Sequence, residues 1–227
     1  MSEIVIVGAG GHGREIAGVV NRLGKDWTVR GFVDDGPVRA ERLARLGHAA
    51  LGPLSWLDDH PATCVLGIGS ASARRTLAER FHSAGCAFAT VVAPTAAIGA
   101  DNDLGVGVVV LDQSTITTNV VIGDHTHLNV ACAVQHDTVV GSFVQFSPGV
   151  LVNGDCTIGD GVFLGSGAVV TRGTRIGDGA TVGAGAVVLQ DVSAGAVVYG
   201  IPARERSDRP LVSSVDHADI ASDEKDG

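Results

Sequence analysis

The second half of the chain carries an apolar residue at every sixth position. Steps of six from Ile98 to Val188 meet sixteen residues that are all apolar, and no insertion breaks the phase. Gly follows many of them directly, and the position two before is usually small or β-branched. Because six residues make one short strand and one corner, three repeats close a triangular coil. The pattern predicts a parallel β-solenoid over residues 94–204, with the Gly after each apolar residue expected to supply corner conformations at positive φ.

The first half of the chain alternates short apolar runs with amphipathic segments. Buried strands are expected over 4–7, 29–34, 64–68 and 87–92, and helices over 15–23, 39–46 and 72–83. Strands that alternate with helices through short links are typical of a parallel sheet covered by helices. We therefore expect a small Rossmann-like α/β domain over residues 1–93. Residues 205–227 are rich in Asp and are expected to form a mobile acidic tail.

Composition excludes several classes of protein. Hydrophobic residues make up 45 % of the chain, which is too many for a disordered protein. A net charge of −9 argues against nucleic acid as a partner. The start of the chain lacks a signal peptide pattern, and no apolar run is long enough to cross a membrane. The four Cys lack metal-finger spacing. We expect a cytoplasmic protein with free thiols.

A glycine-rich segment follows the first expected strand. Gly8, Gly10 and Gly13 satisfy the dinucleotide-binding fingerprint, and Asp34 follows about twenty residues later. Such a turn brings backbone N–H groups and a helix N-terminus to phosphate oxygens. The ligand is a nicotinamide dinucleotide or the diphosphate of a nucleotide sugar, unless the turn binds nothing. About 90 residues make only half of a doubly wound domain, which favours the nucleotide sugar.

A second candidate site lies in the repeats. His136 comes two residues after the core residue Val134, at an expected corner and next to Asp137. A neutral His beside a carboxylate suits a general base near neutral pH. Coil stacking places Gly154 beside His136, which leaves room for a ligand and an exposed N–H group. The alternative is a solvent-facing corner residue without a chemical role.

Several segments, taken in order, resemble one known family. They are Ile4–Glu15, Gly31–Asp35, Gly67–Ser70, Val134–Asp137, Ser147–Gly149 and Gly200–Arg204. Over about residues 3–204 the chain resembles bacterial nucleotide-sugar acyltransferases of the PglD/NeuD type, within the hexapeptide-repeat acyltransferases. The resemblance implies that the solenoid is a left-handed parallel β-helix. It also implies acetyl-CoA as co-substrate and a homotrimer with its sites between subunits.

The resemblance also assigns roles to residues of the repeats. His136 would be the general base, Asp137 its partner, and the backbone amide of Gly154 an oxyanion donor. Coenzyme A would lie along the later coils and contact Gln145, Gly154, Ser166, Ala184 and Arg204. Gln145 replaces a second His found in many relatives, and Gln cannot shuttle a proton. Arg204 would meet the phosphates of the coenzyme, or else be a surface charge.

In the N-terminal domain the resemblance implies a uridine diphosphate sugar. The residues expected around it are Gly8, Gly10, Gly11, His12, Asp34, Asp35 and Gly69. Asp34 or Asp35 would lie near the base or the ribose. His12 would donate to the phosphates, or it would only complete the turn.

His125 and His127 raise a metal-binding alternative. Some hexapeptide β-helices are zinc carbonic anhydrases that bind the metal with three His shared between subunits. Here His127 stacks on Gln145, so the third ligand expected on the next coil is missing. We therefore expect no metal, and zinc analysis of the purified protein tests this.

The expected function is the transfer of an acetyl group from acetyl-CoA to the amine of a nucleotide-linked amino sugar. O-acetylation of a free sugar such as a sialic acid is an alternative. A non-catalytic hexapeptide scaffold is another, which a failure to bind acetyl-CoA would support. The sequence does not identify the sugar, its base or the acyl chain length.

Overall fold

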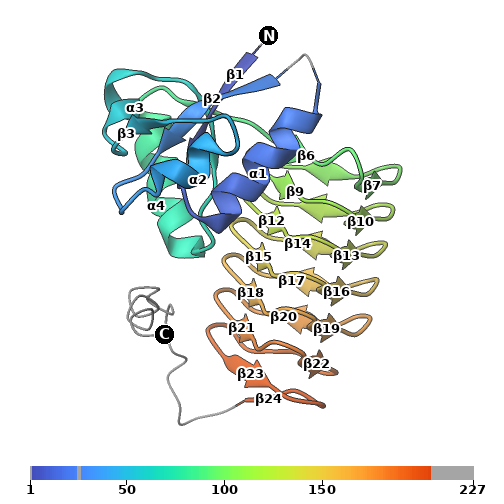
Figure 1. Ribbon diagram of the computed structural model, residues 1–227. Coiled ribbons are helices and arrows are strands. Elements are labelled where there is room, and N and C mark those ends of the chain that lie inside the picture. The colour runs from blue at the N-terminus through green and yellow to red at the C-terminus, as the bar shows by residue number, and fades with distance from the viewer. Residues whose placement is uncertain (1, 25–26, 206–227) are drawn as a thin grey trace, which may run out of the picture.

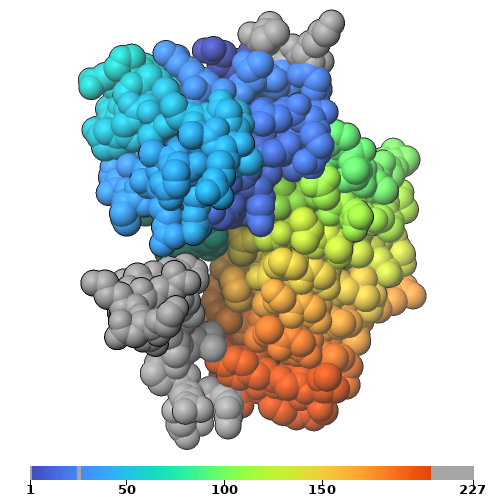
Figure 2. Space-filling view, viewed as in Figure 1, coloured from blue at the N-terminus to red at the C-terminus, as the bar shows by residue number. Residues whose placement is uncertain are grey.

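The computed structural model describes residues 2–24 and 27–205. A small α/β domain lies against the early coils of a long parallel β-helix (Figure 1). The space-filling view shows the later coils extending beyond the α/β domain (Figure 2). The acidic tail expected over 205–227 lies outside the described residues, apart from its first residue.

The N-terminal domain is built on a five-stranded parallel sheet in the order β3-β2-β1-β4-β5. Its strands are β1 (Ser2–Val7), β2 (Trp27–Val33), β3 (Ala50–Gly52), β4 (Thr63–Leu66) and β5 (Ala87–Phe88). Its helices are α1 (Gly11–Arg22), α2 (Ala40–Ala44), α3 (Trp56–Asp59) and α4 (Ala71–Ser83). The strand order reverses between β1 and β4, which creates the switch point where open α/β sheets bind ligands. The sequence analysis predicted neither β3 nor α3.

Period-two alternation in β1 explains why helices cover both faces of this sheet. Ile4 and Ile6 pack with α1 on one face, while Val5 and Val7 pack with α4 on the other. The α1 cluster also includes Val109 from the β-helix, so one hydrophobic core spans the two domains. The α/β domain is therefore held on the β-helix by burial of apolar surface.

The β-helix has three faces, each a parallel sheet except for a final antiparallel pair between β23 and β24. The first face contains β6 (Val91–Val92), β9 (Val109–Val110), β12 (His127–Leu128), β15 (Gln145–Phe146), β18 (Phe163–Leu164), β21 (Thr181–Val182), β23 (Val197–Tyr199) and β24 (Arg204–Glu205). The second contains β7 (Ala97–Ile98), β10 (Thr115–Ile116), β13 (Ala133–Val134), β16 (Leu151–Val152), β19 (Val169–Val170) and β22 (Val187–Val188). The third contains β8 (Asp103–Leu104), β11 (Val121–Ile122), β14 (Val139–Val140), β17 (Thr157–Ile158) and β20 (Arg175–Ile176).

The predicted six-residue register determines this architecture. The apolar position of each repeat points inward, and most of these side chains form one continuous buried cluster from Val110 to Val188. Paired residues on successive coils are eighteen apart, as Ile116 and Val134 show, except at the last coil, where Thr181 pairs with Val197. Each short strand therefore gains its hydrogen bonds and its apolar contacts from the coils above and below it.

The expected role of the Gly after each apolar residue is wrong. Positive φ occurs instead three residues after the apolar position, at Gly and also at non-Gly residues such as His125 and Asp137. The Gly directly after the apolar residue is needed because adjacent coils approach closely. A Cβ on Gly99, for example, would lie 1.8 Å from the carbonyl oxygen of Thr117.

The strand expected over 87–92 is divided between the two domains. Ala87–Phe88 forms β5 and pairs with β4, whereas Val91–Val92 forms β6 and pairs with β9. The first strand of the β-helix thus lies before the predicted boundary at residue 94. A continuous apolar run does not reveal that the chain passes from one sheet to another inside it.

Candidate active site

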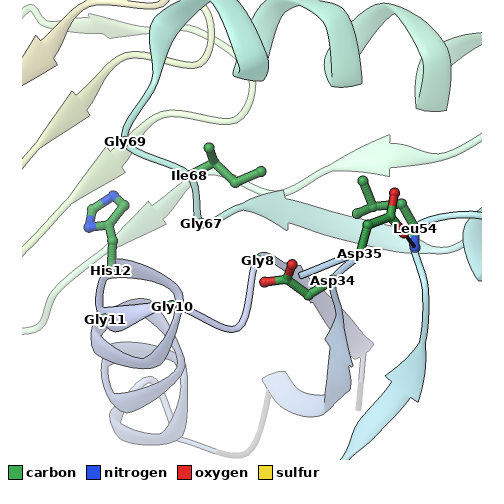
Figure 3. A pocket seen from close by; sticks show the side chains of 10 residues that line it. All are labelled: Gly8, Gly10, Gly11, His12, Asp34, Asp35, Leu54, Gly67, Ile68 and Gly69. Atoms are coloured by element: carbon green, nitrogen blue, oxygen red, sulfur yellow. Dashed lines mark hydrogen bonds between the residues drawn. The ribbon is translucent and has the colours of Figure 1, made fainter. Parts of the chain in front are cut away.

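A pocket of about 410 Å³ lies at the switch point of the N-terminal sheet (Figure 3). It is lined by Gly8, Gly10, Gly11, His12, Asp34, Asp35, Leu54, Gly67, Ile68 and Gly69. All seven residues that the sequence analysis placed around the nucleotide sugar are among them. The loops after β1, β2 and β4 bring these residues together, as expected for a crevice at the carboxyl ends of parallel strands.

Close packing and backbone conformation explain the glycines after β1. Gly8 has a φ of 103°, and a Cβ on Gly13 would lie 1.9 Å from the Gly8 carbonyl oxygen. Helix α1 therefore begins tightly against the end of β1. Its N-cap residue, Gly10, makes no side-chain capping bond. Gly11 and His12, in the first turn of α1, line the pocket, and no side chain of the described residues accepts from the first N–H groups of this helix, which is a favourable arrangement for an anion.

The two acidic residues after β2 have different positions. Asp34 accepts hydrogen bonds from the N–H groups of Ala9 at 2.7 Å and Gly36 at 2.8 Å, so it holds the glycine loop. Asp35 accepts one from the N–H of Leu54 at 2.7 Å, and its second oxygen is not used in this bond. Both carboxylate oxygens of Asp34 therefore accept hydrogen bonds, whereas Oδ2 of Asp35 accepts none within the described residues.

His12 connects the pocket to the β-helix. Its Nε2 shares a hydrogen bond of 2.9 Å with Nδ1 of His127, which lies on the first face. Its Nδ1 lies 3.7 Å from a carboxylate oxygen of Glu15, and the nearby His12 ring lowers the pKa of Glu15. The side chain of His12 is 15 % exposed. His12 thus lines the pocket, while the hydrogen bond to His127 fixes the position of its ring.

His136 and Asp137 form a hydrogen-bonded pair on an edge of the β-helix. Nδ1 of His136 lies 2.8 Å from Oδ2 of Asp137, and the His136 side chain is 43 % exposed. Asn119, one coil earlier, donates to Oδ1 of Asp137 at 2.7 Å. The hydrogen bond from Asn119, followed by the one from His136, lowers the pKa of Asp137. An ionised Asp137 thus keeps the proton of a neutral His136 on Nδ1 and leaves Nε2 as the acceptor.

Gly154 lies against the His136 ring, one coil later. A Cβ at this position would lie 2.5 Å from Cε1 of His136. The space that the sequence analysis expected for a ligand is therefore filled by the imidazole, and Gly154 is buried beneath it. Within residues 2–24 and 27–205 its N–H group makes no hydrogen bond, so it remains a possible donor.

The predicted coenzyme contacts do not lie together on one chain. Ser166 and Ala184 are exposed and follow strands of the first face, whereas His136 and Gly154 follow strands of the second. They therefore occupy two different edges of the prism. Arg204 is exposed on β24, at the end of the first face, and its guanidinium donates to the carbonyl of Ala203.

Gln145 does not face a coenzyme groove. Its side chain is 5 % exposed, its Oε1 accepts from Arg74 at 2.8 Å, and its Nε2 donates to the Phe146 carbonyl. The predicted coenzyme contact is corrected accordingly. The predicted stacking of His127 on Gln145 is confirmed, because the two residues pair on successive coils. The sequence did not predict that α4 covers this face, where Arg74 donates to Gln145.

Arg74, on α4, is the residue that the sequence analysis missed. Its side chain is fully buried between the two domains. The only signal in the sequence was an Arg on the helix expected over 72–83, and nothing there distinguishes Arg74 from Arg75. Burial depends on the β-helix, to which the helix is connected only through tertiary contacts.

The described residues contain neither a metal-binding cluster nor a membrane-spanning helix. No group of three or more His, Cys, Asp or Glu side chains in that part of the chain is arranged to hold a metal ion. No helix there has the length and hydrophobicity required to cross a membrane.

Family models match both halves of the chain. The PglD N-terminal domain matches residues 3–81, and the bacterial transferase hexapeptide (six repeats) matches residues 137–172 and 155–190. No curated protein matches the chain in a sequence search.

Solved structures resemble the chain over almost its full length. The acetyltransferase domain of PglB from Neisseria gonorrhoeae is 28% identical with a TM-score of 0.82, and the match covers 91% of this chain and 100% of that domain. GDP-perosamine N-acetyltransferase from Caulobacter crescentus is 29% identical with a TM-score of 0.84, covering 92% and 98%. WeeI from Acinetobacter baumannii is 28% identical with a TM-score of 0.80, covering 91% and 100%. The chain thus joins a PglD N-terminal domain to a left-handed β-helix of hexapeptide repeats, and along almost its full length it is similar to sugar acetyltransferases of the PglD/NeuD type.

Proposed function

We propose that the protein transfers an acetyl group from acetyl-CoA to the amine of a nucleotide-linked amino sugar. The observation that carries this proposal is the pair of His136 and Asp137, exposed on an edge of the β-helix at 2.8 Å from each other. The similar Caulobacter enzyme has been solved with CoA and GDP-perosamine, including variants in which one His is replaced. The similar PglB domain has been solved with acetyl coenzyme A.

The proposed reaction uses His136 as general base. Nε2 takes a proton from the sugar amine as the amine nitrogen attacks the thioester carbonyl. Asp137 orients the ring and stabilises the imidazolium that forms. The N–H of Gly154 donates to the oxyanion of the tetrahedral intermediate. When the intermediate collapses, the C–S bond breaks, the thiolate of CoA leaves, and the amide remains on the sugar.

The pocket at the switch point would bind the nucleotide. The N-terminus of α1 suits the diphosphate, and Asp35, with one carboxylate oxygen beyond its bond to Leu54, suits a donor on the base or ribose. We propose a UDP-linked sugar, in line with the family resemblance. GDP is the alternative, because the similar Caulobacter enzyme is solved with GDP-perosamine.

Two observations support a homotrimer in which neighbouring copies share each site. His136 does not line the nucleotide pocket, although one substrate has to reach both. Val121 and Val139, on the third face next to the His136 edge, are 43 % and 48 % exposed. A second copy packed there would cover these side chains and bring its own pocket or its Ser166 edge to His136.

Both proposed substrates are cytoplasmic metabolites, and four free buried Cys suit that compartment.

The test is a screen of amino sugars linked to UDP or GDP, each incubated with acetyl-CoA and a thiol reagent. Release of CoA thiol that depends on both substrates is the expected result. Free sialic acid serves as the comparison for O-acetylation. If no sugar releases thiol and acetyl-CoA does not bind, the proposed function is wrong.

A further inference from the structure

Arg74 carries a charge that no carboxylate in the described residues neutralises. It lies in the first turn of α4, is fully buried, and donates only to neutral oxygen atoms. Burial lowers its pKa to about 10, so the guanidinium stays protonated at neutral pH. A buried cation without a counter-ion is costly unless its N–H groups are well satisfied. Here the backbone carbonyls and the Gln145 side chain around Arg74 accept hydrogen bonds from its guanidinium.

On one side, Arg74 holds the rim of the nucleotide pocket. Its Nη1 donates to the carbonyl of Ile68 at 2.8 Å and to that of Gly69 at 3.0 Å. Both residues line the pocket, on the loop between β4 and α4. Arg74 itself does not line it. Any effect of Arg74 on a bound nucleotide must therefore pass through this loop.

On the other side, Arg74 is bound to two coils of the β-helix. Nε donates to the His125 carbonyl at 3.2 Å, and Nη2 donates to the carbonyls of Phe143 and Val144 at 3.0 and 3.1 Å. Nη1 also donates to Oε1 of Gln145 at 2.8 Å. The donors of a guanidinium lie in one rigid plane, so the pocket loop and the β-helix cannot shift independently of each other.

The opposite rim of the pocket is attached to the same face. His12, at the start of α1, is hydrogen-bonded to His127, and His127 pairs with Gln145 on the next coil. His12, which follows the loop after β1, thus contacts the first face directly, whereas the loop after β4 is connected to that face through Arg74. The pocket is fixed at two points to the scaffold that also carries His136.

We propose that Arg74 is a positioning residue for the nucleotide site, which sets the loop over residues 67–69 by hydrogen-bonding it to the β-helix. This inference rests on the proposed function, because it assumes that the pocket binds a nucleotide. It assigns to Gln145 the role of an acceptor for Arg74.

The test compares Arg74→Met with Arg75→Met. Arg75 is the matched control because it also joins α4 to the β-helix, 3.6 Å from Asp160 and over the ring of Phe143. It makes no hydrogen bond to the pocket loop within the described residues. Calorimetric titration measures binding of UDP, GDP and acetyl-CoA separately. Arg74→Met is expected to raise the nucleotide Kd about tenfold and leave the acetyl-CoA Kd unchanged, while Arg75→Met changes neither.

Two further variants keep the proposal testable if Arg74→Met does not fold. Arg74→Lys keeps the charge with fewer donors and is expected to weaken nucleotide binding less. Gln145→Met removes one acceptor at similar volume and is expected to raise the nucleotide Kd several-fold. The inference is overturned if these folded variants bind nucleotide as the unmodified protein does, or if acetyl-CoA binding falls equally. An unmodified protein that binds neither UDP nor GDP would instead refute the proposed function.

Discussion

Two hydrogen-bonded pairs in this molecule each contain a histidine of the hexapeptide repeats, but their surroundings differ. His136 is half exposed on an edge of the β-helix, and its partner is the carboxylate of Asp137. His127 is fully buried beneath the α/β domain, and its partner is the ring of His12. Burial, and next the positive charge of Arg74, hold the pKa of His127 well below its usual value. Of these two pairs, the one at His136 is the more accessible from solvent.

The comparison teaches that the position within the repeat and the covering domain decide what a histidine can do. His127 stands directly before an inward apolar residue and points outward from the first face, where α1 and α4 cover it. His136 stands two residues after one, at a corner that no other element of the described residues covers. Covering a face thus converts a potential acid–base residue into part of an interface.

The largest expected effect concerns the exposed pair. His136→Ala removes the proposed base and should lower kcat by about 10²–10⁴ without changing the fold, because the side chain is 43 % exposed. Steady-state kinetics and a thermal melt measure both quantities. His82→Ala, an exposed His at the end of α4, is the control. Activity within threefold of the unmodified protein would exclude His136 as the base.

The buried histidines should make the fold sensitive to acid. Burial lowers the pKa of His125 to about 4, against about 6.5 in an unfolded chain. The unfolded state therefore binds more protons in this window, and stability falls as the pH drops from about 6.5 toward 4. His125 alone should contribute on the order of 3 kcal/mol of this loss.

Urea unfolding at pH 7 and pH 4.5 measures this acid sensitivity. His125→Asn is the informative variant, since Asn tolerates the positive φ of 54° at this position and does not titrate. The difference in unfolding free energy between the two pH values should shrink in the variant. An unchanged difference would show that His125 is protonated in the folded protein.

Gly154→Ala tests how closely the exposed pair is positioned. The added Cβ would lie 2.5 Å from the imidazole, so the ring has to move. We expect kcat to fall by about 10–10², because small displacements of a reacting group are costly in rate. Thr118→Ala, on the opposite side of His136 in the same stack, should have little effect on kcat. A fully active Gly154→Ala would show that the ring has room to move.

The smallest expected effect concerns the carboxylate. Asp137→Asn keeps a residue that tolerates a φ of 59° and removes the charge. In a single chain the pair is exposed and screened by water, so we expect at most about a fivefold loss of kcat as long as no second copy shields the edge. The lowered pKa of Asp137 keeps it ionised at pH 6 and pH 8, so the loss should be the same at both.

Asp155→Asn, one coil later, is the control for this variant, since Asp155 pairs with Arg172 rather than with His136. A loss of several hundredfold in Asp137→Asn would mean that the pair works in a shielded environment. In that case a second copy of the chain would cover the edge, and the His136 pair would be shielded from water as the His127 pair is.

Local patterns in the sequence determined the repeat, the sheet and the pocket loops. The six-residue register could be followed without tertiary information because each coil packs only on its neighbours. For the same reason the stacking of His136 with Gly154, and of His127 with Gln145, was predicted correctly. The glycine loop and Asp34 were likewise recognisable, because a strand, a turn and a helix N-terminus follow one another in the chain.

Tertiary structure alone decided how the two halves meet. Arg74 and Gln145 are 71 residues apart, and His12 and His127 are 115 apart. No local pattern indicates that these side chains are buried together, because their burial depends on the α/β domain covering one of three similar faces. The same covering turned a predicted coenzyme contact, Gln145, into an acceptor for a buried guanidinium. The same arrangement left His136 half exposed on an edge that no other described element covers.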